Sequence, residues 1–250
     1  NTYDTSAARR EKISSQAARA SQLNPASVRA ALAVARSLDN DYDQPETLEM
    51  LRELHRRAPE DQHVIFHLIR AEGRRQNEAA VQTLLLKLRA LPRTGMLPLT
   101  LWFLELRLRN EGRFAEATAI IEEMLAWPEP LRGAYYEKLN LLMGSWHDLA
   151  EVEPFLAQIP VRYLQEPAFG SAIAQYWLWR GEPEKTLQAL ARVPQDYFEE
   201  YAASEPKAFH AGWAHTLAGR PAAAQAEWRN ALALVEGRLR TDSRNFTLLN

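Results

Sequence analysis

Two short groups of polar side chains in this sequence have residue types that bind metal ions in other proteins. The first is the run DNDYD at residues 39–43, which is how many calcium-binding loops begin. A calcium loop needs glycine at its sixth position and glutamate at its twelfth, but counting from the first aspartate those positions hold Gln44 and Met50. We therefore expect these aspartates to cap helix ends around a turn.

The second group is a pair of histidines. His63 and His67 lie four residues apart, so on a helix they would share one face and could bind zinc. The metalloprotease form of this pair is HExxH, but the sequence here is HVIFH, with Val64 where the catalytic glutamate belongs. The chain has no cysteine, and no clear third ligand stands near the pair. We expect two ordinary helix histidines and no metal.

Other catalytic motifs are missing from the sequence. The ten glycines never form GxGxxG or GxxxxGK, so no phosphate-binding loop is expected. Serine and histidine occur without the strand–turn–helix pattern of a nucleophile elbow. Carboxylates occur throughout the chain, as on any solvated helix, and they single out no acid–base pair. We therefore expect no enzymatic activity and no cofactor.

The elements that must carry these side chains are marked by a ladder of prolines. Prolines recur at steps of 34, 33, 36, 32 and 34 residues, at Pro25, Pro59, Pro92, Pro128, Pro160 and Pro194. Each one follows a stretch with helical hydrophobic spacing, and proline cannot continue a helix. A period near 34 residues is typical of stacked helical hairpins.

Glycines and prolines also predict where the two helices of each hairpin meet, in turns such as GRF at 112–114, GSW at 144–146 and GEP at 181–183. The predicted pairs are 26–39 with 45–58, 61–73 with 77–90, 98–110 with 114–126, 131–143 with 147–158, 167–180 with 183–193, and 205–218 with 221–240. Residues 5–23 read as a second helix without its partner. The longer loop PQDYFEEYAASEP is expected to pack Tyr197, Phe198 and Tyr201 against the helices.

The segment EGRFAEATAIIEEMLAWP resembles a tetratricopeptide repeat (TPR). It has the glycine–aromatic turn of that family at Gly112 and Phe114, a small contact residue at Ala117, and Met124 and Pro128 at its end. The segment AFHAGWAHTLAGRPAAAQAEWRNAL matches next best. Its matching positions are Gly212, Ala224, Trp228 and Ala231. The resemblance covers about residues 8–240.

One position departs from the family pattern. The small residue of the first helix is Ala35, Ala174 or Gly212 in some hairpins, but that slot holds His67, Glu105 and Glu137 in others. Either the latter hairpins pack more openly, or the repeat register shifts by a residue there.

The resemblance implies an all-α fold, a right-handed α-solenoid of about six TPR-like hairpins in a single domain over residues 1–250. Residues 1–25 would be a partial repeat and residues 241–250 the start of a further one, so we expect a fragment of a longer chain. The closing segment also resembles repeat regions attached to bacterial kinases, nucleotide cyclases and winged-helix regulators, which implies a bacterial signalling context.

The resemblance further implies a concave groove lined by the first helices. The groove positions carried over from the family are Arg36, Leu68, Trp102, Leu106, Arg109, Lys138, Gln175, Trp179, Phe209 and Trp213. Tryptophan and arginine are common in binding hot spots, although neighbouring helices could bury some of these residues. We expect a non-catalytic scaffold that binds a protein or peptide partner. The lysine–asparagine clamp of the chaperone-tail-binding members is not expected, because Leu32 and Arg36 occupy its positions.

The charge and hydropathy of the chain limit the kinds of partner and function that remain. The net charge of −2, from 30 basic and 32 acidic residues, gives no long-range attraction to nucleic acid or anionic lipid. An RNA-binding repeat, which needs a basic groove, is therefore the less favoured alternative. A structural spacer that self-associates through the ends of the array stays open. No apolar run reaches the ~18–20 residues of a membrane span. We expect a cytoplasmic location, although the start at Asn1 predicts a truncated N-terminus.

Overall fold

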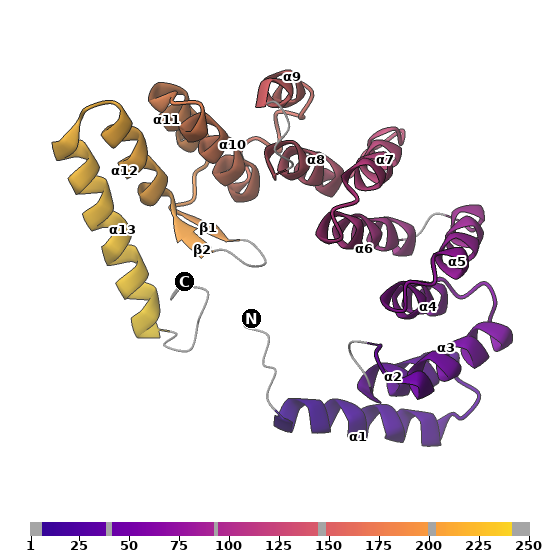
Figure 1. Cartoon of the computed structure of the whole chain (residues 1–250). Coiled ribbons are helices and arrows are strands. Elements are labelled where there is room, and N and C mark those ends of the chain that lie inside the picture. The colour runs from indigo at the N-terminus through magenta and orange to yellow at the C-terminus, as the bar shows by residue number, and fades with distance from the viewer. Residues whose placement is uncertain (1–6, 39–41, 93–94, 145–148, 200–203, 242–250) are drawn as a thin grey trace. The chain divides into compact units, whose positions relative to one another are not determined.

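The computed structural model describes residues 7–38, 42–92, 95–144, 149–199 and 204–241, whose regular elements are helices and one short ribbon of two strands (Figure 1). The first half contains α1 (Ala7–Leu23), α2 (Val28–Leu38), α3 (Pro45–Arg57), α4 (Gln62–Arg74), α5 (Glu78–Ala90), α6 (Met96–Asn110) and α7 (Phe114–Leu125). The second half contains α8 (Arg132–Gly144), the 3-10 turn η1 (Leu149–Glu151), α9 (Val152–Leu156), α10 (Pro167–Trp179), α11 (Pro183–Ala191), β1 (Tyr197–Glu199), β2 (Ser204–Pro206), α12 (Lys207–Leu217) and α13 (Pro221–Thr241).

The chain divides into two compact units, Asn1–Ile120 and Ile121–Asn250, and the boundary falls inside α7. We refer to them as unit 1 and unit 2. The all-α expectation is confirmed for the described residues, whereas the arrangement of all hairpins in one solenoid stays a prediction.

Glycine and proline set the helix ends as the sequence predicts. Gly112, Gly181 and Gly219 follow first helices with φ angles of +75°, +68° and +68°, a left-handed conformation that favours glycine. After α4 the same place is taken by Gln76, whose φ is +56°. Prolines occupy the first turn of α3, α10 and α11, where a backbone N–H would have no acceptor within the helix, so its absence costs no hydrogen bond.

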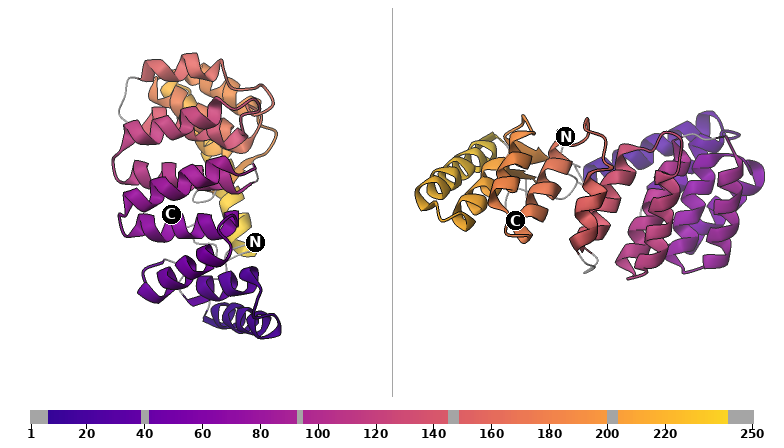
Figure 2. Two further views of the ribbon diagram at one scale, coloured as in Figure 1. Left: turned by 90° about the vertical axis from the view of Figure 1, so that its right-hand side faces the viewer. Right: turned by 90° about the horizontal axis from the view of Figure 1, so that it is seen from above.

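The helices of unit 1 pack in sequence order, with α2 against α3, α3 against α4, and α4 against both α5 and α6. Figure 2 shows these helices side by side. The apolar core of the unit includes Leu51, Val64, Ile65, Leu88 and Leu101, each at most 1% exposed. Burial of such side chains is worth about 1.5–3 kcal/mol each, which offsets the conformational entropy lost by the ordered hairpins.

The contact slot of the first helices is buried whichever residue occupies it. Ala35 and Ala174 are 0% exposed, and the polar occupants His67, Glu105 and Glu137 are only 4%, 0% and 8% exposed. At Gly212 an added Cβ would lie 2.2 Å from Nε1 of Trp228. The polar slot residues are therefore as buried as the small ones, and the repeat register stays a prediction.

The second helix of the hairpin that begins with α8 is shorter than predicted. The sequence predicts one helix over residues 147–158, of which 147 and 148 lie outside the described residues, but α9 covers only Val152–Leu156 and follows the 3-10 turn η1. Pro154 lies inside this segment and has no N–H to donate to the preceding turn. Val152 and Phe155 still enter the core of unit 2, where they pack with Leu139 and Phe169.

The long loop before α12 contains the ribbon, which the sequence did not predict. β1 pairs with β2 in antiparallel register, with Phe198 opposite Glu205. Tyr197 and Phe198 are 7% and 2% exposed, and Phe198 packs with Val193 and Leu190. Their packing against the helices is confirmed, while Tyr201 lies outside the described residues.

Candidate binding surfaces

The predicted groove residues differ widely in exposure. The exposed ones are Arg36, Trp179, Phe209 and Trp213. The half-buried ones are Trp102, Leu106, Arg109, Lys138 and Gln175. The members that belong to unit 1 are Arg36, Leu68, Trp102, Leu106 and Arg109, and the others belong to unit 2.

Leu68 requires a correction, because it is 4% exposed and offers no surface to a partner. Residues 64–69 of α4 are all buried, so this helix has no open face over nearly two turns. Its neighbours α3, α5 and α6 pack around it. The position carried over from the family assumes a helix with one face open to solvent, and α4 does not have one at Leu68.

Two of the predicted cations already have acidic partners. Nε of Arg109 lies 3.4 Å from Oε1 of Glu105, a carboxylate that is fully buried. Nζ of Lys138 donates to Oε1 of Glu122 at 2.5 Å. The side chains of Arg109 and Lys138 are 24% and 16% exposed. A partner would therefore have to compete with these internal pairs.

Exposed aromatic rings gather on the last two helices of unit 2. Phe209 and Trp213 lie one turn apart on α12, with their rings edge to face at 6.5 Å and 84°. Trp228 of α13 meets Trp213 in the same way at 5.9 Å and 72°. The three are 43%, 47% and 38% exposed. We call these three residues the aromatic surface. Large aromatic side chains left in water cost free energy that a partner can recover by covering them.

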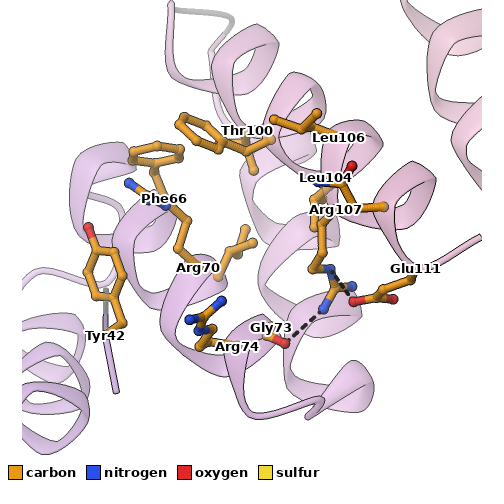
Figure 3. Close-up of a pocket in the computed structure, with 13 residues that line it drawn as sticks. Tyr42, Phe66, Arg70, Gly73, Arg74, Thr100, Leu104, Leu106, Arg107 and Glu111 are labelled. Atoms are coloured by element: carbon orange, nitrogen blue, oxygen red, sulfur yellow. Dashed lines mark hydrogen bonds and ion pairs between the residues drawn. The ribbon is translucent and has the colours of Figure 1, made fainter. Parts of the chain in front are cut away.

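Unit 1 contains a pocket that the predicted groove residues did not reveal. Its cavity volume is about 400 Å³, and it lies between α4, α6 and Tyr42 of the α2–α3 loop (Figure 3). The lining residues are Tyr42, Phe66, Ile69, Arg70, Gly73, Arg74, Thr100, Phe103, Leu104, Leu106, Arg107, Asn110 and Glu111. Leu106 is the one predicted groove residue among them. We call this cavity the Arg70 pocket.

Arg70 is held by three aromatic rings. Its Cζ atom lies 4.4 Å from the ring centre of Phe103, 4.8 Å from that of Tyr42 and 5.7 Å from that of Phe66. Such cation–π contacts are worth about 0.5–2 kcal/mol each, depending on desolvation. Among the described residues, no hydrogen-bond acceptor or carboxylate pairs with the Arg70 guanidinium.

The other two arginines of the pocket are paired. Arg74 binds Asp43 with Nε and Oδ1 at 3.1 Å. Arg107 donates to the carbonyl oxygen of Gly73 at 3.0 Å and binds Glu78 at 2.8 Å and Glu111 at 3.7 Å. Among the described residues of the lining, Arg70 is therefore the arginine without a carboxylate partner.

Tyr42 and His67 support one side of the pocket. Tyr42 has a φ of +61°, which is strained for a residue with a Cβ, and its hydroxyl bonds Nδ1 of His67 at 2.5 Å. Burial, together with the positive charges of Arg36 and Arg70, lowers the pKa of His67 to about 3. The imidazole is therefore neutral at pH 7, and its Nδ1 can accept a hydrogen bond from the tyrosine hydroxyl.

The α2–α3 loop is fastened from the end of α4. Arg75 donates to the carbonyl oxygens of Tyr42, Asp43 and Gln44 at 2.5, 3.1 and 3.0 Å. These bonds fix the backbone that carries Tyr42 into the pocket. The calcium-like run includes residues 39–41, which lie outside the described residues, and the described Asp43 forms an ion pair with Arg74.

A polar cluster in unit 2 anchors the ribbon. Glu205 of β2 accepts from Oγ of Ser171 at 3.0 Å and lies 2.7 Å from Nε2 of His210. Burial raises the pKa of Glu205, but hydrogen bonds from His210 and Ser171 and the charge of His210 outweigh it, so the net shift is downward. The serine bonds the carboxylate and not the histidine, so this cluster joins α10, β2 and α12 without activating the serine hydroxyl.

Sequence reasoning missed Arg70, Phe66 and Phe103, although a signal was present. Phe66 and Arg70 stand four residues apart, which places them on one helical face, and Phe103 follows Arg70 by nearly one repeat. The contribution of Tyr42 had no such signal, because it depends on a loop whose path is set by Arg75.

No protein-family model matches the chain, and no match was found among curated proteins. Across the described residues, no group of three or more histidine, aspartate or glutamate side chains could hold a metal ion. No helix in the described ranges is long and apolar enough to cross a bilayer. The TPR resemblance therefore stays an expectation, and a functional assignment must rest on the geometry of the two surfaces.

Proposed function

We propose that this chain is a non-catalytic interaction module, a solenoid of TPR-like hairpins that binds a segment of a partner polypeptide along its first helices. The observation that carries this proposal is the aromatic surface of unit 2. Phe209 and Trp213 lie on the first helix of the last hairpin, one turn apart, and about half of each side chain remains in water.

Such a surface fits a partner better than an internal role. Aromatic anchors that are rigid, partly exposed and supported from behind are enriched among binding hot spots. Trp228 provides that support, since its ring contacts Trp213 and its indole covers Gly212. A partner that covered these rings would remove apolar area from water without having to reorganise the helices beneath.

The test is to select binders for the whole chain from a library of short random peptides and to titrate the selected peptides against variants. Trp213→Ala should weaken the best peptide by about 2 kcal/mol, roughly 30-fold, if Trp213 is a hot spot. The thermal unfolding midpoint should change little, since Trp213 lies outside the core. Selection of no peptide would count against the proposal.

The matched control is Leu86→Ala, which removes a large apolar side chain that is 63% exposed on α5, a second helix. Its effect on peptide affinity should be negligible. Light scattering on the same samples examines the structural alternative. A mass that rises with concentration and falls in the Trp213→Ala variant would assign the aromatic surface to self-association.

A further inference from the structure

We infer that the Arg70 pocket binds the side-chain carboxylate of an acidic residue in the partner segment, together with an apolar residue next to it. This inference rests on the proposed function and gives it a chemical class of ligand. It follows from the contacts of the Arg70 guanidinium, from the ion pairs of the other arginines in the pocket, and from the apolar side chains that line it.

The guanidinium of Arg70 lies beside aromatic rings, and no hydrogen-bond acceptor pairs with it among the described residues. Its three ring neighbours are Tyr42, Phe66 and Phe103, and aromatic rings meet a guanidinium over its planar faces. The five N–H donors of arginine lie in the plane of the group. Within the described ranges no acceptor pairs with those of Arg70. A carboxylate supplies two acceptor oxygens with the spacing of the guanidinium fork.

The other arginines of the pocket are already paired with carboxylates. Arg74 binds Asp43, and Arg107 binds Glu78 and Glu111. Among the described residues, Arg70 is the lining arginine with which no carboxylate pairs. A ligand carboxylate would supply that partner, and a neutral ligand would leave the guanidinium as it is.

The walls of the pocket favour an apolar group beside the carboxylate. Phe66, Phe103, Leu104 and Leu106 contribute apolar side chains to the lining. The cavity of about 400 Å³ is in the usual range for small-ligand sites and can hold an acidic side chain with part of its neighbour. The pocket is formed chiefly by α4 and α6, first helices of adjacent hairpins, which is where the proposed function places a partner segment.

The experiment uses the whole chain and random peptides with amidated C-termini, so that any carboxylate comes from a side chain. Selection on the wild type should enrich aspartate or glutamate next to an apolar residue. In titrations, replacing the acidic residue of the best peptide by its amide should weaken binding about tenfold. Arg70→Met should cause a similar loss for the acidic peptide and almost none for its amide version. Arg70→Lys, which keeps charge but loses the fork, should fall between.

Arg74→Met is the matched control, since Arg74 lines the same pocket but is already paired with Asp43. It should change affinity by at most about twofold. An equal loss in the Arg70 and Arg74 variants would indicate diffuse attraction and overturn the inference. The same conclusion follows if the selected peptides show no acidic preference, or if only peptides with a free C-terminal carboxylate bind.

Failure of the inference and failure of the proposed function give different results. If peptides are selected but do not depend on Arg70, the inference alone is overturned. If the wild type selects no peptide from either library, the proposed function falls and this inference falls with it. Circular dichroism melts check the fold of each variant. Should Arg70→Met not fold, the wild-type comparison of acid and amide peptides, with Arg70→Lys, decides the question.

Discussion

The hairpin of α4 and α5 in unit 1 and that of α12 and α13 in unit 2 fill the same contact slot by opposite means. In unit 2 the slot residue is Gly212, and the indole of Trp228 from the paired helix occupies the space. In unit 1 the slot residue is His67, which fills the space itself and takes a hydrogen bond from Tyr42. A small residue in the slot needs only a side chain of complementary shape from the paired helix. A polar residue also needs a hydrogen-bond partner, because its burial without one costs free energy.

The difference extends to the aromatic side chains of the two hairpins. Around α4 they close on Arg70, because α6 and the α2–α3 loop lie beside them. On α12 the rings of Phe209 and Trp213 remain in water. The two surfaces therefore differ in chemistry. The Arg70 pocket offers a cation that can bind an anion, whereas the aromatic surface offers apolar area that a partner can bury.

The largest expected effect tests the packing of the contact slot between α12 and α13. Ala224 of α13 is 2% exposed, so Ala224→Glu would overpack the hairpin and bury an unpaired charge. We expect a loss of about 3–5 kcal/mol in the free energy of unfolding, measured by urea denaturation. Ala226→Glu is the control, because Ala226 is exposed on the same helix and should change stability by no more than about 0.5 kcal/mol. Equal losses would mean that the register is wrong.

The next effect tests the polar slot through pH. The pKa of His67 is about 3 in the folded chain and near its ordinary 6.5 when unfolded, so between these values the unfolded chain binds more protons. Stability should therefore fall on acidification, by about 2 kcal/mol from pH 7 to pH 5 for this group. His67→Gln should lack that component. His63→Gln is the control, since burial lowers the pKa of the less buried His63 too, and its effect should be smaller. Identical pH profiles in wild type and His67→Gln would refute the burial argument.

A third prediction concerns close approach at another glycine of unit 2. A Cβ on Gly170 would lie 2.2 Å from Cγ2 of Val193 and 3.4 Å from Cε1 of Phe198, and both side chains are buried. Gly170→Ala should cost about 1–3 kcal/mol in thermal or urea unfolding. Gly237→Ala in α13 should instead gain about 0.5–1 kcal/mol, because only the end of Arg240 lies near, at 3.9 Å. Gains at both sites would show that the α10 contact is loose.

The smallest effect compares the turns of the two units. Gln76 of unit 1 has the left-handed backbone that Gly219 has in unit 2. Gln76→Gly should therefore stabilise the chain by up to about 1 kcal/mol, because the strain of a Cβ at positive φ is removed. Gln82→Gly, in the exposed interior of α5, should do the reverse by about the same amount. A loss at Gln76 comparable to that at Gln82 would contradict the assigned turn geometry.

The sequence predicted the helices well because their ends depend on nearby residues. The pair expected at 167–180 and 183–193 is Pro167–Trp179 and Pro183–Ala191 in the structure. Proline at a helix start and glycine at a helix end act through their own backbone, so they can be read locally. The ribbon was missed because its strands are three residues each and pair across a loop.

The solvent exposure of the predicted groove residues was harder to predict from the sequence than the helix ends. Phe209, Trp213 and Trp179 are exposed, as expected, but Leu68 is buried because three helices enclose α4. The period of a repeat places a residue on a face of its helix. Whether a further helix covers that face depends on packing between elements, which the pattern of one repeat does not contain.

The sequence by itself determined that this chain is helical and where most of the described helices start and end. These features follow from backbone preferences and hydrophobic spacing within a few turns. Only the tertiary structure decided that Tyr42 bonds His67, 25 positions away, and that Arg70 lies among rings from three segments, with no acceptor in the described part of the chain. The physical reason is that pairing and desolvation of polar groups depend on neighbours that only folding brings together.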